Sequence, residues 1–251
     1  MGKIIVANWK MNPNSAEDAK SLFDAVKNGI NNSKAEVIIC PPYVYLSLLR
    51  GLTLGAQNVS IKESGAFTGQ VSAVMLKDIG VQYSIVGHSE SRQYLKETNQ
   101  DINQKIVACL NNDIKVILCI GENEGPASTP GYGEAKERKT EVLDSEILEG
   151  LSGISEENLK NIIIAYEPIF AIGTGKSCSI EETKQSISII KNAISKIYSQ
   201  KSADEIKIIY GGSVNSQNAE GYLQEAGVDG LLVGGASLKP EEFIKIVESA
   251  N

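Results

Sequence analysis

The chain has 251 residues, 42% of them apolar, and its 24 basic and 31 acidic side chains give a net charge of −7. This length allows one large domain or two small ones, with a core that needs no disulfide or structural metal. The acidic balance excludes a general nucleic-acid or anionic-membrane binder, because both require clustered lysine and arginine. A small anionic substrate is still possible, since it needs only local positive potential.

No stretch approaches the roughly 18 apolar residues of a membrane span, and the apolar stretch at the N-terminus is too short for a signal peptide. The single histidine and the absence of a C-x-x-C pair argue against a Cys/His zinc site. We therefore expect a cytoplasmic protein without a bound metal, in which the four cysteines are free thiols. These are Cys40, Cys109, Cys119 and Cys178.

Short β-branched runs recur along the chain, and most are continuously apolar rather than alternating. This pattern is typical of strands that are covered on both faces, as in parallel sheets. The predicted strands are Ile4–Ala7, Val37–Cys40, Val59–Ile61, Tyr83–Val86, Val116–Ile120, Ile162–Tyr166, Ile206–Tyr210 and Gly230–Val233.

Amphipathic helical patterns lie between these strands. Their expected start signals are Ser15 with Asp18, Pro42, Thr98 or Asp101, Ser179 with Glu182, and Pro240. Eight strands alternating with helices in 251 residues predict an α/β fold, a closed parallel (β/α)8 barrel, with a doubly wound open sheet as the alternative. No linker or change in composition divides the chain, so we expect a single domain over residues 1–251.

Polar residues and glycines collect at the strand ends, where a barrel forms its active site. Glu167 follows a fully apolar strand, and a carboxylate there is costly unless it is paired or functional. Desolvation would make it a stronger base than a free glutamate. The simpler interpretation is a carboxylate that emerges into solvent or pairs with a lysine.

His88, the single histidine, ends the fourth strand. A lone histidine is usually structural or solvent-facing, but a helix N-terminus would disfavour its cationic form, and a neutral ring could donate to an oxyanion. Lys10 is either a snorkelling surface lysine or the positive charge beside an anion. The pairs Gly211–Gly212 and Gly234–Gly235 either make tight turns or offer backbone N–H groups to a phosphate.

Eight ordered segments between residues 8 and 238 resemble the triosephosphate isomerase family. They are Asn8–Asn12, Gly65–Gly69, Gly87–Glu90, Cys119–Glu122, Ala165–Pro168, Ala171–Lys176, Tyr210–Asn215 and Asp229–Leu238. The resemblance implies a TIM barrel that interconverts dihydroxyacetone phosphate and D-glyceraldehyde 3-phosphate in glycolysis and gluconeogenesis. This is an aldose–ketose isomerisation, for which no metal or organic cofactor is implied.

Carried over by motif, the resemblance implies that Glu167 is the base and that His88 is the neutral electrophile. It implies that Lys10 supplies positive charge near the substrate, that Asn8 is a further hydrogen-bond donor, and that Glu90 has a supporting role. The phosphate would be held by backbone N–H groups of Gly173, Ser213, Gly234 and Gly235.

The resemblance also implies a homodimer formed through the loop Ser64–Ile79, with Thr68 near the neighbour's active site. Gln70 and Ser91 stand where the family usually has the acid and the base of an interface ion pair. Because both charges are missing together, neither position leaves an unpaired charge in the interface. We therefore expect an interface that depends less on salt.

A lid over Pro168–Cys178 is implied as well, and it would exclude water when closed. Phe170 and Cys178 replace the Trp and Ala that are usual in the family's lid hinges, so we expect altered lid kinetics.

Two other functions are considered: a different barrel enzyme that acts on a phosphorylated metabolite, such as an aldolase or another sugar-phosphate isomerase, and a non-enzymatic paralogue that only binds phosphate. A Schiff-base aldolase needs a central lysine, which the predicted strand cores lack. A paralogue would be expected to lack Glu167 or His88, and both are present.

Overall fold

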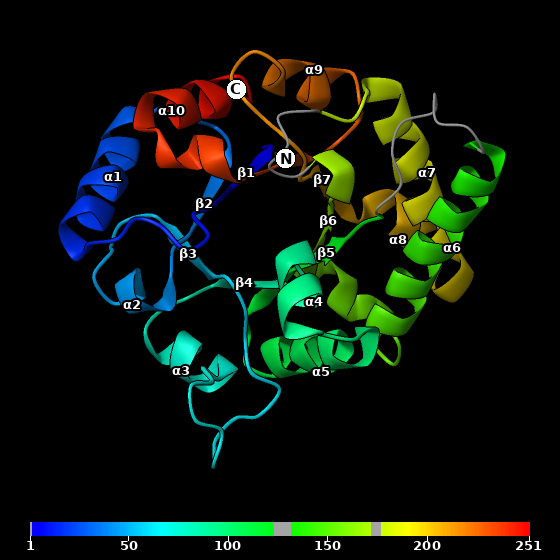
Figure 1. Cartoon of the computed structure of the whole chain (residues 1–251), viewed down its shortest axis with the longest axis horizontal. Helices are drawn as coiled ribbons and strands as arrows, with labels where there is room; N and C mark the ends of the chain where they lie inside the picture. Colours follow the sequence, from blue (N-terminus) through cyan, green and yellow to red (C-terminus); the bar gives the residue numbers. More distant parts are fainter. Residues whose placement is uncertain (1, 123–131, 172–176) are drawn as a thin grey trace.

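The computed structural model of the chain describes residues 2–122, 132–171 and 177–251 (Figure 1). Its strands form a closed parallel barrel in chain order, in which each strand pairs with the next and the last pairs with the first. The predicted (β/α)8 barrel is therefore confirmed. The strands are β1 Ile4–Asn8, β2 Glu36–Cys40, β3 Thr53–Ala56, β4 Tyr83–Val86, β5 Lys115–Ile120, β6 Ile162–Tyr166, β7 Lys207–Tyr210 and β8 Gly230–Val233.

Helices connect successive strands and surround the barrel (Figure 1). The α-helices are α1 Ala16–Gly29, α2 Tyr43–Leu46, α3 Ala73–Asp78, α4 Ser89–Leu95, α5 Asn99–Leu110, α6 Tyr132–Gly150, α7 Ile180–Ile197, α8 Gln200–Glu205, α9 Ala219–Gln224 and α10 Pro240–Glu248. The 3-10 helices in the described residues are η1 Glu156–Asn161, η2 Ile169–Ala171 and η3 Gly235–Leu238. In the described part of the chain, no helix is long and apolar enough to span a membrane.

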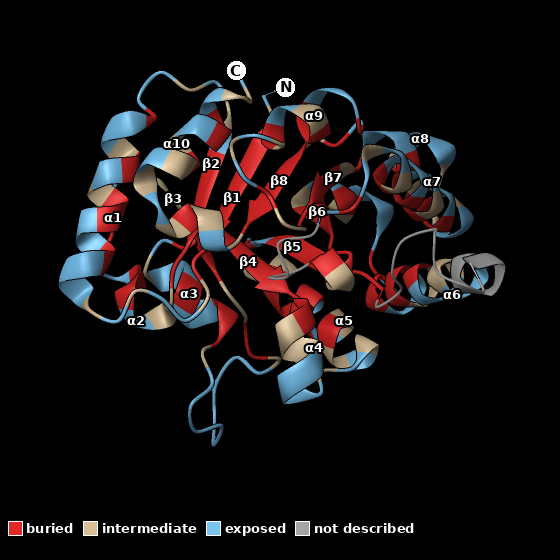
Figure 2. Cartoon of the chain, turned by 45° about the horizontal axis from the view of Figure 1, so that its top comes forward, coloured by how far each residue is buried: buried red, intermediate tan, exposed pale blue. Residues whose placement is uncertain are grey.

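Both faces of the strands are buried, as Figure 2 shows for the centre of the barrel. Alternate residues of a strand point to opposite sides. On β1, Ile4 and Val6 belong to the small cluster inside the barrel, together with Ile117. Ile5 and Ala7 belong to the larger cluster between the barrel and the helices. Burial on two faces explains why the strand sequences are continuously apolar.

Seven of the predicted strands are confirmed to within one residue at each end, and the third was wrong. The observed third strand is Thr53–Ala56, whereas the predicted Val59–Ile61 lies in a loop. Gly55 weakens the strand pattern, because glycine is depleted from strands. A Cβ on Gly55 would lie 2.5 Å from Sγ of Cys40, so packing between adjacent strands excludes a larger residue.

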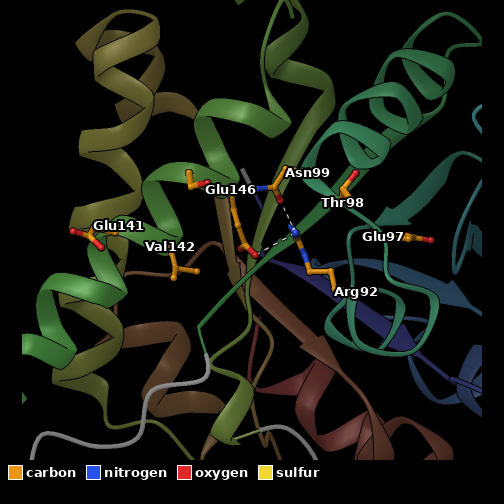
Figure 3. Close-up of a pocket in the computed structure, with 8 residues that line it drawn as sticks. Arg92, Glu97, Thr98, Asn99, Glu141, Val142 and Glu146 are labelled. Carbon is orange, nitrogen blue, oxygen red and sulfur yellow. Dashed lines mark hydrogen bonds and ion pairs between the residues drawn. The ribbon is translucent and has the colours of Figure 1, made fainter.

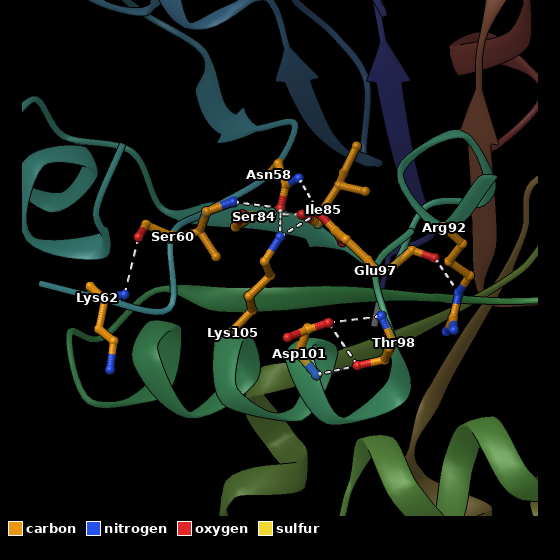
Figure 4. Close-up of polar contacts among 12 residues, drawn as sticks. Asn58, Ser60, Lys62, Ser84, Ile85, Arg92, Glu97, Thr98, Asp101 and Lys105 are labelled. Carbon is orange, nitrogen blue, oxygen red and sulfur yellow. Dashed lines mark hydrogen bonds and ion pairs between the residues drawn. The ribbon is translucent and has the colours of Figure 1, made fainter. Parts of the chain in front are cut away.

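Most of the predicted helix starts are confirmed. Thr98 and Asp101 form a reciprocal capping box at α5 (Figure 4), and Ser179 and Glu182 form another at α7. Pro240 is the first residue of α10.

Two starts differ in detail. Ser15 caps α1 by accepting a hydrogen bond from the backbone N–H of Asp18 at 3.0 Å, while its own hydroxyl donates to the Asp18 carboxylate at 2.6 Å. Pro42 precedes the short helix α2, which ends well before Gly51.

Candidate active site

A cavity of about 470 Å³ lies at the carboxyl ends of the strands. Because all strands are parallel, their ends bring together residues that are far apart in the sequence. Of the residues predicted for the site, the cavity is lined by Asn8, Lys10, His88, Glu167, Ser213, Gly234 and Gly235. Gly173 lies outside the described residues.

His88 and Glu167 face each other in this cavity. Nε2 of His88 lies 3.1 Å from Oε1 of Glu167, and the backbone N–H of Ser89 donates to Oε2 at 3.2 Å. Glu167 is 2% exposed and His88 is 6% exposed. One carboxylate oxygen thus accepts a hydrogen bond from Ser89 and the other contacts the His88 ring, in a site that is largely shielded from bulk water.

The hydrogen bonds of His88 identify its tautomer. The backbone N–H of Glu90 donates to Nδ1 at 3.2 Å. A ring nitrogen that accepts a hydrogen bond carries no proton, so the ring proton is assigned to Nε2 from this network. His88 therefore has a neutral ring whose one N–H group lies beside Glu167.

Lys10 adopts a left-handed backbone conformation with φ 53°, which is uncommon for a residue other than glycine and costs about 1 kcal/mol or more. Its N–H donates to Oδ1 of Asn8 at 3.0 Å, and its carbonyl oxygen accepts from Nε2 of Gln57 at 2.8 Å. These two side chains hold the strained backbone, and the ammonium group forms an ion pair with Glu90.

Two glycines allow the backbone to pack closely around Glu167. A Cβ on Gly121 would lie 1.7 Å from the carbonyl oxygen of Glu167, and a Cβ on Gly211 would lie 2.9 Å from its Cγ. Neither distance is compatible with a side chain at these positions. The backbone N–H of Glu167 also donates to the carbonyl oxygen of Ile120 at 2.7 Å, which anchors it to the end of β5.

A second buried carboxylate, Glu122, lies at the end of β5. The hydroxyl of Tyr166 donates to Oε1 of Glu122 at 2.9 Å, and Nζ of Lys139 lies 2.9 Å from the same oxygen. Burial raises the pKa of the Glu122 carboxyl, while Lys139 and Tyr166 act in the opposite direction. This group joins β5, β6 and α6 beside the cavity.

A third buried carboxylate, Glu146 on α6, was not anticipated from the sequence. It accepts a hydrogen bond from the backbone N–H of Gly121 at 2.8 Å and lies 3.2 Å from Nη1 of Arg92. Burial raises the pKa of its carboxyl to about 7. The sequence could have pointed to Glu146, because it lies between the apolar residues Leu143 and Ile147, which are buried on one face of the helix.

The backbone donor of Ser89 and the side chain of Gln57 were also not singled out from the sequence. Ser89 donates to the side chain of Glu167, and Gln57 donates to the backbone of Lys10. In both cases the partner is far away in the sequence. In the described residues, no group of three or more His, Cys, Asp or Glu side chains is placed to hold a metal ion.

The chain matches the family model described as Triosephosphate isomerase over residues 3–250. The triosephosphate isomerase of Caldanaerobacter subterraneus subsp. tengcongensis is 42% identical to it, with 97% of this chain and 98% of the relative covered. That of Dictyoglomus thermophilum is 42% identical over 98% and 99% of the two chains. That of Clostridium tetani is 39% identical over 97% and 95%.

The closed barrel and the cavity at its strand ends define an α/β-barrel enzyme with a carboxylate and a neutral imidazole side by side. The comparisons make the class specific. The chain belongs to the triosephosphate isomerase family and is an isomerase. The reaction of this family is the interconversion of dihydroxyacetone phosphate and D-glyceraldehyde 3-phosphate, a step of glycolysis.

Proposed function

We propose that the chain interconverts dihydroxyacetone phosphate and D-glyceraldehyde 3-phosphate with Glu167 as the base and His88 as the electrophile, in glycolysis and gluconeogenesis. The observation that carries this proposal is the 3.1 Å contact between Nε2 of His88 and Oε1 of Glu167 in the strand-end cavity. A carboxylate and a neutral N–H donor are the two groups that an enolisation requires.

The proposed reaction begins when Glu167 takes a proton from C1 of dihydroxyacetone phosphate. The electron pair of the C–H bond becomes the C1–C2 double bond of an enediolate, and negative charge develops on the former carbonyl oxygen. The Nε2–H of His88 stabilises this charge by a hydrogen bond. Glu167 then returns the proton to C2, while the hydroxyl proton passes from O1 to O2, which yields the aldehyde. No cofactor is needed, because the proton returns to the substrate.

We propose that the phosphate is bound by local donors, since the chain as a whole carries a charge of −7. Lys10 supplies the positive charge and Asn8 a polar side chain at the mouth of β1. The backbone N–H groups of Ser213, Gly234 and Gly235 would surround the phosphate, with Gly173 as a further proposed donor. The space that a Cβ on Gly235 would enter is open, so a ligand can approach this backbone closely.

The function is tested by a coupled assay with glyceraldehyde 3-phosphate. Glu167→Gln keeps the volume of the side chain but cannot accept the proton, so we expect kcat to fall about 10²- to 10⁴-fold with an unchanged far-UV circular dichroism spectrum. Glu225→Gln, an exposed charge change at the end of α9, is the control. An inactive wild type would reject the function, and an active Glu167→Gln would reject Glu167 as the base.

We also propose a homodimer, in which a second copy packs on the loop Ser64–Ile79. Residues 64–70 of this loop are all exposed and extend away from the barrel below α3 (Figure 2). Exposed apolar side chains lie on this loop and on α4: Phe67 is 45% exposed, Met75 54% and Leu95 67%. Exposed apolar side chains gathered on adjacent elements are typical of a protein interface.

The base of this loop is firmly held, as an interface element requires. Nζ of Lys105, which is 7% exposed, donates to Oδ1 of Asn58 at 2.8 Å and forms an ion pair with Glu97 (Figure 4). The backbone N–H of Ser60 donates to the carbonyl oxygen of Val71 at 2.8 Å, which closes the loop.

Sedimentation equilibrium tests the dimer. We expect a mass of twice the 26.9 kDa of one chain. Leu95→Asp should give monomers, because it would bury an unpaired charge in the interface. Ile197→Asp on α7, across the barrel from this surface, is the control (Figure 1). A monomeric wild type at micromolar concentration would reject the dimer.

We further propose that residues 1–251 are one domain and that the protein works in the cytoplasm. Its eight described strands close into one barrel. All four cysteines are free and buried, which suits a reducing compartment.

A further inference from the structure

An ion pair between α4 and α6 contacts the backbone at the ends of two neighbouring strands. The guanidinium group of Arg92 donates from Nε to the carbonyl oxygen of Gly87 at 2.8 Å and from Nη2 to that of Cys119 at 3.2 Å. Nη1 lies 3.2 Å from Oε1 of Glu146 (Figure 3). The other oxygen of Glu146 accepts from the backbone N–H of Gly121 at 2.8 Å.

Each of these backbone contacts leads directly to one of the two residues proposed to carry the chemistry. Gly87 precedes His88 in the chain, so Arg92 holds the peptide from which the histidine projects. Gly121 packs against the backbone of Glu167, where a Cβ would lie 1.7 Å from its carbonyl oxygen. The ion pair therefore connects the backbone supports of His88 and Glu167.

The ionised form of Glu146 is unfavourable at this position. The residue is 8% exposed, and burial raises the pKa of its carboxyl to about 7, although Arg92 and the N–H of Gly121 favour the charge. The nearby carboxylates of Glu122 and Glu167 also raise it. A glutamine could accept the hydrogen bond from Gly121 without this penalty. The contact to Gly121 therefore requires an acceptor oxygen at this position rather than a charge.

We propose that Glu146 is a positioning residue for the isomerisation, which acts through Arg92 and Gly121 to set the placement of His88 relative to Glu167. This inference rests on the proposed roles of His88 and Glu167. Glu146 and Arg92 do not line the substrate cavity but a separate hollow of about 440 Å³ on the outside of the barrel (Figure 3). Their loss should therefore lower kcat and leave the Michaelis constant nearly unchanged.

Two substitutions of similar volume separate positioning from packing. Glu146→Met removes both acceptors, whereas Glu146→Gln keeps an oxygen for the N–H of Gly121. In the coupled assay we expect the Met variant to lose about tenfold in kcat, because small misplacements of reacting groups are costly. The Gln variant should keep at least half of the wild-type value. Glu141→Gln, an exposed charge change on the same helix, is the matched control.

The single histidine of the chain gives a second readout that does not depend on activity. In protein labelled with ¹⁵N-histidine, the Nε2 signal reports the surroundings of this nitrogen, which contacts Oε1 of Glu167 at 3.1 Å. We expect Glu146→Met to shift this signal and Glu146→Gln to leave it near its wild-type position. An inactive wild type would reject the proposed function, while the histidine signal would still test the positioning.

A folded Glu146→Met variant with wild-type kcat and an unmoved histidine signal would overturn the proposal. If the Met variant does not fold, Arg92→Lys provides the test. One ammonium group cannot hold Gly87, Cys119 and Glu146 together as the planar guanidinium does, so the same loss in kcat and the same shift are expected. Wild-type values for a folded Arg92→Lys would overturn the proposal equally.

Discussion

Nε2 of His88 lies 3.1 Å from Oε1 of Glu167, so the proposed electrophile is in direct contact with the proposed base. The carbonyl oxygen of a substrate needs the same N–H. Substrate binding must therefore replace the contact between the two side chains by a hydrogen bond from His88 to the substrate. This exchange frees one oxygen of Glu167 as the substrate arrives, while the N–H of Ser89 can still hold the other, as it does at 3.2 Å.

The first prediction concerns the protonation of His88. Because Nδ1 accepts from the backbone N–H of Glu90 at 3.2 Å, ¹⁵N spectra at pH 7 should show one protonated and one unprotonated ring nitrogen. Addition of 2-phosphoglycolate should shift the Nε2–H signal as the ligand displaces Glu167. Two protonated nitrogens, as in an imidazolium, would contradict the assigned tautomer.

The second prediction concerns the wall behind Glu167. Gly211→Ala would place a Cβ 2.9 Å from Cγ of Glu167, which forces the side chain out of its present position. We expect kcat to fall about 10- to 100-fold, with a smaller effect on the Michaelis constant, in steady-state assays. Gly150→Ala is the control, because its Cβ would meet its nearest neighbour at 3.8 Å. Unchanged turnover of Gly211→Ala would show that this contact does not position the base.

The sequence was sufficient to predict the barrel and most residues of the cavity, because these follow from local patterns. Continuously apolar runs marked the strands, and Lys10, His88 and Glu167 stand within two residues of the observed strand ends. In a closed parallel barrel, all strand ends meet at one face, so position along each strand was enough to bring these side chains together.

What was missed depends on contacts across the chain. Gln57 reaches the backbone of Lys10, 47 positions away, and Glu146 reaches Gly121 from α6, 25 positions away. No local pattern encodes such partners, and Glu146 only breaks the apolar face of its helix. The third strand was missed because Gly55 meets a neighbouring cysteine, which is a packing requirement rather than a strand preference.

The third prediction concerns stability and pH. The pKa of the Glu146 carboxyl is raised from 4.5 to about 7 in the folded chain, so the folded state binds this proton more tightly than the unfolded state does. The stabilisation from this group is complete below about pH 4.5 and is lost as the pH rises through about 7. Glu146→Gln removes this dependence. In urea unfolding at fixed protein concentration, the unfolding free energy of the variant should increase relative to that of wild type between pH 5 and 8, by up to about 3 kcal/mol.

A difference in unfolding free energy that is constant over this pH range would contradict that assignment of the titrating group. The comparison with the variant removes the titration of Glu146 itself, while Glu122, whose carboxyl pKa is raised in the same direction, titrates in both proteins.

The last prediction concerns the salt dependence of the proposed dimer. Gln70 lies on the exposed loop and Ser91 on α4, and neither carries a charge. Association through apolar side chains such as Phe67 and Leu95 is not screened by salt, unlike a surface ion pair. The dimer dissociation constant from sedimentation should therefore change less than about threefold between 0.05 and 1 M NaCl. The double variant Gln70→Glu with Ser91→Arg supplies the matched comparison, because an added ion pair should make association weaken with salt. Strong weakening of the wild-type dimer by salt would show instead that other charges hold the interface.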